Sequence, residues 1–480
     1  MVSGSYQTSL VTYFIHRDLF PALMKVNSPG RAYGQADVLQ YSHDHPENSS
    51  SSLVLLGLLA NYNKFESQNL YQNRLEDFVN EDTIRGLVYS SAHTCSSIRD
   101  QYVSVQNDVP AAWTVNSTLA YVGLRALSSE AKKPEPTEDE AKGLFNALPS
   151  AEAAILLSAY SFVQGNKIFA SGLVTLPADR SGETPLSAFL SSTSYIADHA
   201  HRSGRASTYA IFNLLVIRML VEDNVLVKKL CSKDSQTTIR LCRQRTPHLP
   251  PASTSRIPAT AILDICTATM SHNLRKRLDI PLYSILVSII LRLLTHLEST
   301  KTRLHHHWPY LWGTLLTLTR FLATYSNDLS HARDIRSSLC APLTSLLAFS
   351  LSKGDAFLPD PASYDDLFYK LIEARSILLK FRDAYCKPSS PPDSLTRSIN
   401  ALINVANHYH TFLAAQHGGK RTHQSPAAIQ KVIKEGHETL DMGGDEGFGT
   451  WERWRENSWK ASLKQMIRVA VEDARVLALQ

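Results

Sequence analysis

The stretch EDTIRGLVYSSAHTCSSIRDQYVSV, Glu81 to Val105, indicates the fold class of this 480-residue chain. Apolar and small residues recur along it with the i, i+3, i+4, i+7 spacing that places them on one face of an α-helix. The predicted buried stripe consists of Ile84, Leu87, Val88, Ser91, Ala92, Cys95, Ile98 and Tyr102. The pattern predicts a long amphipathic helix.

Further helices are predicted in the second half of the chain. In the stretch that begins SYDDLFYKLIEARSILLKF, Ser363 is the expected N-cap, with Asp366 three residues later completing a capping box. The segments Trp308–Tyr325 and 282–297 are apolar on nearly all sides, which is typical of helices packed between other helices. Strand patterns are scarce and no fixed repeat period is found. The predicted fold class is all-α, and an α-solenoid and an irregular helical bundle both stay open.

Composition restricts the class of function. The chain is 44% hydrophobic, and its 49 basic and 44 acidic residues give a net charge of only +5, far from the footprint of a nucleic-acid-binding protein. The six cysteines are widely spread without a CxxC pair, which favours buried thiols in a reducing compartment. The N-terminus lacks the pattern of a secretory signal. We therefore expect a cytosolic protein.

Two apolar runs, 207–220 and 281–297, are long enough to require a test for membrane spans. Both fall short of the roughly 20 uninterrupted apolar residues that cross a bilayer. Arg218 interrupts the first run, and Arg292 and His296 interrupt the second. Both are predicted to be buried helices.

Polar segments rich in proline or charge suggest how the chain is divided. Residues 128–140 (SSEAKKPEPTEDE) and 243–258 (RQRTPHLPPASTSRIP) are too polar to bury, and both are interpreted as exposed connections. The predicted division is an N-terminal helical unit at 1–127, a charged linker at 128–145, a helical segment at 146–242, a Pro-rich connection at 243–258 and a C-terminal helical unit at 259–480.

No catalytic or cofactor signature is found. The chain contains no HExxH, GxSxG or P-loop motif, and the Gly-rich stretch at 443–449 follows no strand pattern. Residues i and i+2 of a helix point apart, so histidine pairs with this spacing are expected on surfaces or loops, not as metal ligands. These pairs are His43 with His45, His199 with His201, and His408 with His410. We therefore predict no enzyme activity, cofactor or metal.

A basic run is the remaining electrostatic signal. The six cations are Lys228, Lys229, Lys233, Arg240, Arg243 and Arg245. Each would contribute on the order of 1 kcal/mol near an anionic leaflet. No amphipathic helix with large apolar anchors accompanies the run. A solvated loop face is therefore favoured, and contact with an anionic membrane is the alternative.

Several ordered motifs resemble one protein family, that of armadillo-like helical domain-containing protein 3, in its C-terminal region. They are LFPALMKV at 19–26, LLGLLANYNKFESQNLYQNRLEDFVNE at 55–81, IRDQYVSVQND at 98–108, LAYVGLRAL at 119–127, RLHHHWPYLWGTLLTLTRFL at 303–322 and GDAFLPDPASYDDLFYKLI at 354–372. Members of this family carry further armadillo-like helices before the first motif, whereas only residues 1–18 precede it here. We therefore expect a front part to be missing.

The resemblance implies an armadillo-like, all-helical adaptor without catalysis of its own, peripherally associated with the Golgi. The implied partners are phosphatidylinositol 4-kinase beta and a large Arf guanine-nucleotide exchange factor of the secretory pathway. The family defines no catalytic residues, so no active site is transferred to this sequence.

Two groups of residues within the motifs are candidate partner-binding positions. Asn and aromatic side chains suit either a docking surface or a turn fastened by side-chain hydrogen bonds, and for the first group we favour the turn. The first group is Asn61, Tyr62, Lys64, Phe65 and Tyr71. The second lies in a Pro-rich loop, of a kind that often anchors partners, and consists of Phe357, Leu358, Pro359 and Tyr364.

Overall fold

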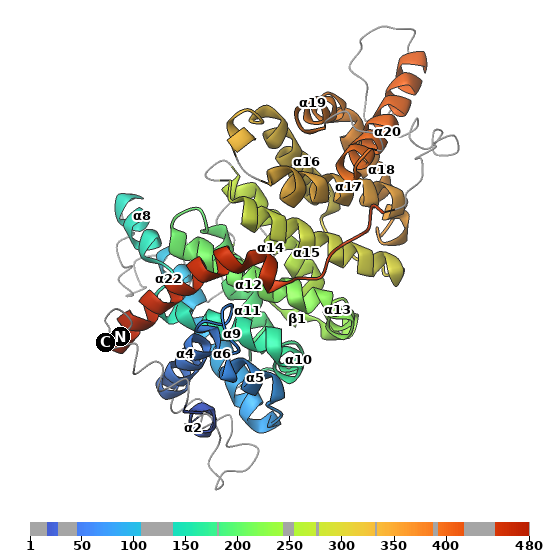
Figure 1. Ribbon diagram of the computed structural model, residues 1–480. Helices are drawn as coiled ribbons and strands as arrows, with labels where there is room; N and C mark the ends of the chain where they lie inside the picture. Colours follow the sequence, from blue (N-terminus) through green and yellow to red (C-terminus); the bar gives the residue numbers. More distant parts are fainter. Residues whose placement is uncertain are drawn as a thin grey trace, which may run out of the picture. The chain divides into compact units, whose positions relative to one another are not determined.

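A computed structural model describes most of the chain (Figure 1). The described residues are 17–26, 46–106, 138–179, 182–242, 254–274, 278–331, 334–386, 392–416 and 447–479. Within them the structure is almost entirely helical, as predicted, with one pair of two-residue strands.

The chain forms two compact units, each assembled from separate parts of the sequence. Unit 1 comprises residues 1–220, 232–261 and 455–480, and unit 2 comprises residues 221–231 and 262–454. The chain passes between them within α12 (Gly204–Glu222) and α14 (Pro258–Asn273). The predicted segment boundaries do not coincide with these units, because the last 26 residues fold with the N-terminal ones.

Unit 1 is built from helices of both ends of the chain. Its other elements are α2 (Phe20–Val26), α4 (Pro46–Asn61), α5 (Leu70–Asp77), α6 (Glu81–Gln106), α8 (Glu138–Ala147), η2 (Ala151–Ala154), α9 (Ile155–Gly165), α10 (Lys167–Thr175), α11 (Pro185–Asp198), η3 (Lys233–Ser235), β1 (Thr237–Thr238), β2 (Ser255–Arg256), η8 (Glu456–Trp459) and α22 (Lys460–Leu479). Helix α8 begins inside the segment that was predicted to be a linker.

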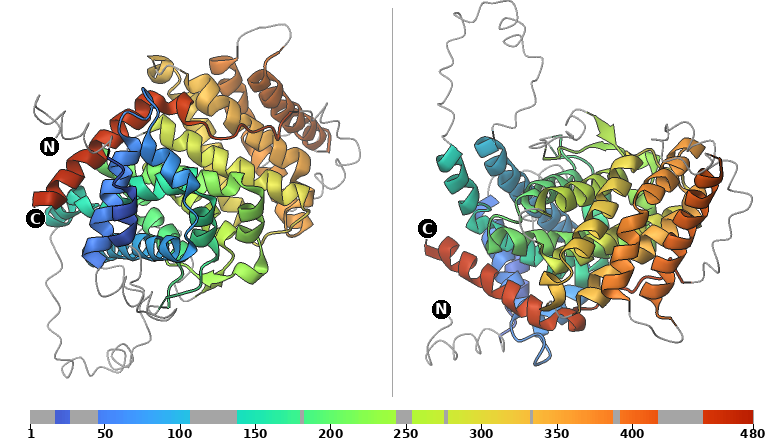
Figure 2. Two further views of the ribbon diagram at one scale, coloured as in Figure 1. Left: turned by 60° about the horizontal axis from the view of Figure 1, so that its bottom comes forward. Right: turned by 90° about the horizontal axis from the view of Figure 1, so that it is seen from above.

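The predicted apolar stripe of α6 forms part of the core of unit 1. All eight stripe residues, from Ile84 to Tyr102, are buried. Helix α6 packs against α11, α4 packs against α9, and α22 lies across α4 and η2 (Figures 1 and 2). The i, i+3, i+4 pattern is confirmed because the residues that it groups are those that α6 buries.

Unit 2 consists of α13 (Asn224–Leu230), most of α14, α15 (Ile280–Ser299), α16 (Trp308–Thr324), η4 (Asp328–His331), a π-helical turn η5 (Arg336–Cys340), α17 (Ala341–Lys353), η6 (Gly354–Ala356), α18 (Pro361–Glu373), α19 (Arg375–Tyr385) and α20 (Ser394–Gln416). Helix α17 packs against α15 and α20, and α16 packs against α18 and α19.

Helix α15 is the one helix among the described residues that is long and apolar enough to cross a membrane. Within its most apolar window, 67% is buried inside the protein, as in the core helix of a soluble protein. Buried residues include Leu282, Ile289 and Leu293. The predicted burial of this run is therefore confirmed, as is that of the first run, in α12, where Phe212, Leu214 and Ile217 are fully buried.

The N-terminal end of α18 differs from the prediction. The helix begins at Pro361, and its N-cap is Asp360, whose carboxylate accepts a hydrogen bond from the backbone N–H of Ser363. Ser363 lies inside the first turn and is not the cap. The prediction was wrong because proline suits the first helical position, so Pro361 starts the helix earlier than the Ser-x-x-Asp pattern indicates.

Candidate interaction surfaces

The polar residues of the turn between α4 and α5 fasten it from within. The side chain of Asn61 donates to the carbonyl of Gly57 and to Ser161 Oγ, both at 2.7 Å. Asn69 caps α5 by accepting from the N–H groups of Tyr71 and Gln72. Its amide also donates to the carbonyls of Leu59 and Tyr62. These bonds are those expected of a structural turn.

The aromatic residues of the same turn differ in accessibility. Tyr71 is fully buried, and its hydroxyl donates to the carbonyl of Arg17 and accepts from the N–H of Leu19. Tyr62 and Phe65 are partly exposed, and Asn63 between them is exposed with a left-handed φ of 48°. Only the outer edge of the turn is therefore open to a partner.

Lys64 points inward from this turn and is paired inside unit 1. Its side chain is 2% exposed, and its Nζ lies 2.7 Å from Oε1 of Glu456 in η8, whose side chain is 12% exposed. The hydroxyl of Tyr160 donates to the same carboxylate oxygen at 2.5 Å. Burial lowers the pKa of Lys64, and Glu456 opposes that shift. The turn thus binds the C-terminal segment of its own chain.

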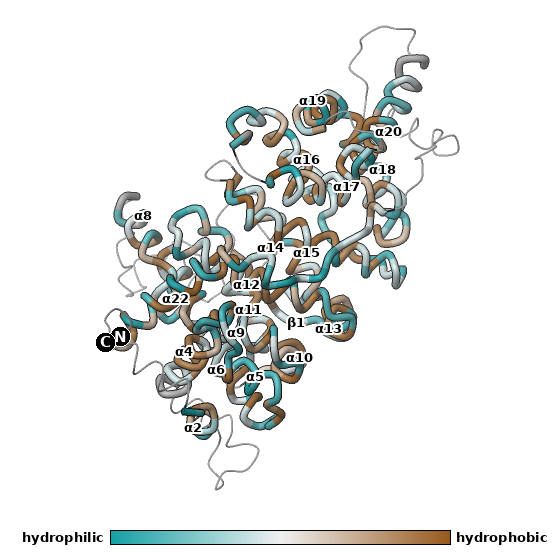
Figure 3. Tube along the Cα trace, viewed as in Figure 1, coloured by the Kyte–Doolittle hydropathy of each residue, from teal (hydrophilic) through white to brown (hydrophobic). Residues whose placement is uncertain are grey.

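Further contacts of the C-terminal segment surround this buried pair. Lys460 donates to the carbonyl of Phe65 and lies 5.8 Å from the Phe65 ring centroid. Lys464 forms an ion pair with Glu66 on the surface. The polar stretch that leads into α22 is drawn in teal in Figure 3. Electrostatic contacts therefore join this segment to the α4–α5 turn.

A second buried anchor holds the far end of α22. Asp473 is 3% exposed, accepts from Arg205 at 2.5 Å and accepts from the Tyr209 hydroxyl at 2.7 Å. Sequence reasoning missed this residue, although a signal was present. Asp473 continues the buried face of Leu463, Met466 and Ala470 at helical spacing, and a carboxylate on an apolar face requires a partner.

The second candidate loop, 354–364, is largely closed by packing. Phe357 and Leu358 are 0% and 1% exposed, and the Phe357 ring contacts that of Trp308. Pro359 and Tyr364 are partly exposed, and the hydroxyl of Tyr364 donates to the carbonyl of Leu351. Direct contact between a partner and Phe357 or Leu358 would require the loop to open.

The four basic residues of the run that the structure describes are divided between the two units. Lys228 and Lys229 are exposed on α13 of unit 2, with Val225 70% exposed one helical turn earlier. Lys233 is exposed and Arg240 is partly exposed in unit 1. Arg243 and Arg245 lie outside the described residues.

Two of the three histidine pairs lie within the described residues, in different environments. His43 and His45 lie outside the described residues. His408 and His410 are two residues apart on α20, where their side chains diverge as predicted. His199 is 1% exposed and follows α11, whereas His201 is partly exposed. His199 therefore lies in a turn, one of the two expected locations, but it is buried and not on the surface.

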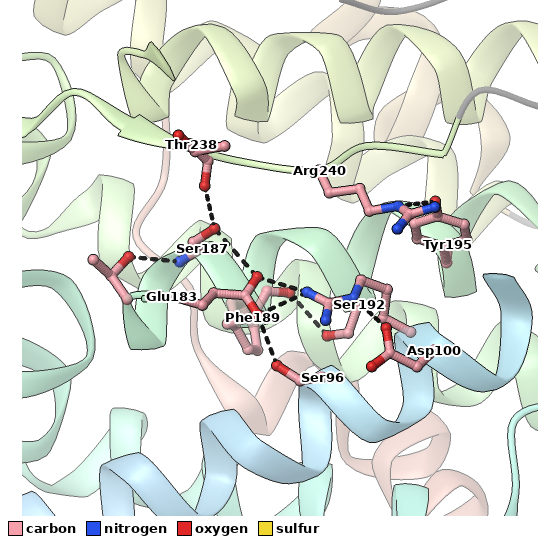
Figure 4. A network of polar contacts seen from close by, with 11 residues as sticks. Ser96, Asp100, Glu183, Ser187, Phe189, Ser192, Tyr195, Thr238 and Arg240 are labelled. Atoms are coloured by element: carbon pink, nitrogen blue, oxygen red, sulfur yellow. Dashed lines mark hydrogen bonds and ion pairs between the residues drawn. The ribbon is translucent and has the colours of Figure 1, made fainter. Parts of the chain in front are cut away.

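A polar network ties the β1 strand to α11 and α6 (Figure 4). Glu183 accepts from Arg99 at 2.6 Å and from Ser96 at 2.9 Å, while Ser187 donates to the carbonyl of Thr238 at 2.5 Å. Farther along, the Arg240 guanidinium donates to the Tyr195 hydroxyl. These hydrogen bonds hold Thr238 and Arg240 against α11.

The fold and these surfaces define an all-helical protein of the armadillo-like class. Residues 256–476 match the family described as armadillo-like helical domain-containing protein 3, C-terminal. The UPF0588 membrane protein of Schizosaccharomyces pombe is 28% identical over 422 residues, which are 87% of this chain and 66% of that protein.

Two vertebrate proteins are similar to this chain over more of its length. Armadillo-like helical domain-containing protein 3 of Danio rerio is 23% identical and that of Homo sapiens 22% identical, each over 96% of this chain and 70% of the relative. This chain is similar to armadillo-like helical domain-containing protein 3 over most of its length, and residues 256–476 match the family's C-terminal domain. It spans about two thirds of the length of these relatives. No solved structure matches it.

Proposed function

We propose that this protein is a non-catalytic helical scaffold that binds proteins of the Golgi secretory pathway. The similarity to armadillo-like helical domain-containing protein 3 is the observation that supports the proposal. Stacked helices present extended surfaces for partners, which is how such folds act in general. In this proposal the polar side chains of the α4–α5 turn, of loop 354–364 and of the Glu183 network stabilise the fold or contact partners. They catalyse no reaction.

The proposed partners are phosphatidylinositol 4-kinase beta and a Golgi Arf guanine-nucleotide exchange factor. Through them the protein would support formation of phosphatidylinositol 4-phosphate. The proposed location is cytoplasmic, with peripheral association with the Golgi. Family resemblance supports these assignments.

The outer edge of the α4–α5 turn is the proposed docking surface. Asn63, Ser67 and Gln68 are exposed there, next to the partly exposed rings of Tyr62 and Phe65. Aromatic rings beside exposed polar groups are typical of interface anchors. The buried pair beneath the turn keeps its backbone in one conformation, which lowers the entropy lost on binding.

Binding of the purified kinase to the immobilised full chain tests the proposal. We expect capture by the wild type, and a loss of affinity of at least tenfold in Ser67→Arg/Gln68→Arg, which changes only exposed side chains. The matched control is Thr175→Arg, an exposed position on α10. The same comparison for the second loop uses Asp355→Arg/Ala362→Arg with Thr317→Arg as control. No capture by the wild type would reject the kinase as partner.

Direct binding to anionic membranes is the second candidate function. Val225, Lys228 and Lys229 share one exposed face of α13, combining an apolar residue with two cations. The S. pombe relative is named a membrane protein. Flotation with phosphatidylserine vesicles tests this candidate. Salt-sensitive binding that Lys228→Gln/Lys229→Gln weakens supports it, and no binding by the wild type removes it.

A further inference from the structure

Three buried side chains at one end of α11 carry the donor atoms of a metal site. Asp198 is the last residue of α11, His199 is its C-cap, and Cys242 follows β1. All three are buried, and one ligand atom from each lies within 4.8 Å of the others. Cys242 Sγ and Asp198 Oδ2 are 3.6 Å apart.

The distance between sulfur and oxygen fits a tetrahedral ion. With metal–sulfur and metal–oxygen bonds of about 2.3 and 2.0 Å, tetrahedral zinc separates these two donors by about 3.5 Å. A thiolate is a soft ligand and an imidazole suits zinc, so a set of one sulfur, one nitrogen and one carboxylate oxygen favours zinc. Calcium and magnesium prefer sites made of oxygen ligands alone. A thiolate and a carboxylate would together neutralise a divalent cation.

His199 is oriented as a ligand by its surroundings. Its Nδ1 lies 2.8 Å from the carbonyl of Tyr195, so Nδ1 carries the proton and Nε2 keeps a lone pair. The ring is held between Phe145, at 4.8 Å between centroids, and Tyr102, at 4.9 Å.

The neighbouring groups add two further observations. The backbone N–H of Cys242 donates to Ser194 Oγ at 3.0 Å, and the network of Figure 4 fixes residues 237–240 just before it. The Tyr102 hydroxyl, on a residue that is 0% exposed, has no hydrogen-bond partner among the described residues. The Tyr102 ring contacts the His199 ring, and a buried polar atom without a partner on this residue points to a group that completes the site.

We propose that Asp198, His199 and Cys242 bind one zinc-class divalent ion, which joins residues 237–242 to the end of α11. The Tyr102 hydroxyl or a water molecule completes the tetrahedron. The ion has a structural role, because the site is buried in the core of unit 1.

Metal loading of the full chain tests the site. After incubation with Zn²⁺ and dialysis against metal-free buffer, we expect one zinc per chain by elemental analysis. Loading with Co²⁺ instead should give the near-ultraviolet charge-transfer band of a cobalt–thiolate bond. Cys242→Ser should lose this band and bind zinc at least tenfold more weakly. Cys266→Ser, which removes a buried thiol of α14, is the matched control and should keep both properties.

A second measurement on the wild type avoids variants that fail to fold. Bound zinc should slow alkylation of Cys242 by iodoacetamide at least tenfold while leaving that of the partly exposed Cys386 unchanged. Retention of less than 0.1 zinc per chain would overturn the proposal. A cobalt complex without the thiolate band, or equal alkylation of Cys242 with and without zinc, would do the same.

Discussion

Lys64 Nζ and Glu456 Oε1 lie 2.7 Å apart although 392 positions separate the two residues in the sequence. The pair is almost fully shielded from solvent, so neither charge is well hydrated. It joins the first helices of unit 1 to the segment that enters α22. The folding of unit 1 therefore depends on residues at both ends of the described chain.

Removing one partner of this pair should destabilise unit 1. In Lys64→Ala the Glu456 carboxylate stays buried and loses its ion pair, while it keeps the hydrogen bond from the Tyr160 hydroxyl. Loss of one member of a buried ion pair costs about 3–5 kcal/mol. Urea unfolding followed by circular dichroism measures the change. Lys64→Met/Glu456→Gln should cost less, because no buried charge remains unpaired.

The exposed pair of Lys464 and Glu66 supplies the control. Both side chains are more than 40% exposed, so Lys464→Ala should change the free energy of unfolding by less than about 1 kcal/mol. Equal losses in Lys64→Ala and Lys464→Ala would contradict the importance of the buried pair.

The stability of unit 1 should depend on pH through Lys64. Burial lowers the pKa of Lys64 in the folded state, whereas in the unfolded chain the pKa of a lysine is about 10.4. Between these values the unfolded state binds more protons, so the contribution of Lys64 to the free energy of unfolding rises with pH. The free energy of unfolding should be measured for the wild type and for Lys64→Met between pH 8 and 10.5. As the pH rises, the wild type should gain stability relative to Lys64→Met. A shift in the other direction would mean that attraction to Glu456 outweighs burial.

Two helical glycines should respond oppositely to alanine. A Cβ at Gly57 of α4 would lie 2.2 Å from Ser158 Oγ, which itself donates to the carbonyl of Leu53. Gly57→Ala should therefore cost about 1–3 kcal/mol through overpacking. A Cβ at Gly313 of α16 meets nothing within 4 Å, and Gly313→Ala should stabilise by up to about 1 kcal/mol. Thermal unfolding of both variants makes the comparison.

The cysteines should differ sharply in reactivity. Cys386 is partly exposed, and the other five are buried. Burial raises the pKa of Cys95, Cys231 and Cys340 to about 12, so little thiolate forms at neutral pH. Brief alkylation of the native protein followed by mass spectrometry should label Cys386 first, and all six should react in urea. Early labelling of Cys95 would show that α6 opens on the timescale of the reaction.

The sequence by itself determined the helices and the class of fold. The apolar stripe from Ile84 to Tyr102 and the apolar run of α15 were predictable because helical periodicity and burial are local properties of the sequence. The family motifs were recognisable for the same reason, since they are short and contiguous. The favoured interpretation of Asn61 as a turn residue agrees with its hydrogen bond to the carbonyl of Gly57, because amide side chains bond nearby backbone groups.

Only the tertiary structure decided which residues meet across the chain. Lys64 could not be distinguished from a surface lysine without Glu456, and His199 could not be distinguished from a loop histidine without Cys242, 43 positions later. The return of α22 to the N-terminal helices has no local signal apart from the buried carboxylate of Asp473. Pairings of this kind depend on how helices pack at long sequence separation, and the periodicity of each helix fixes which face is buried but not which helix covers it.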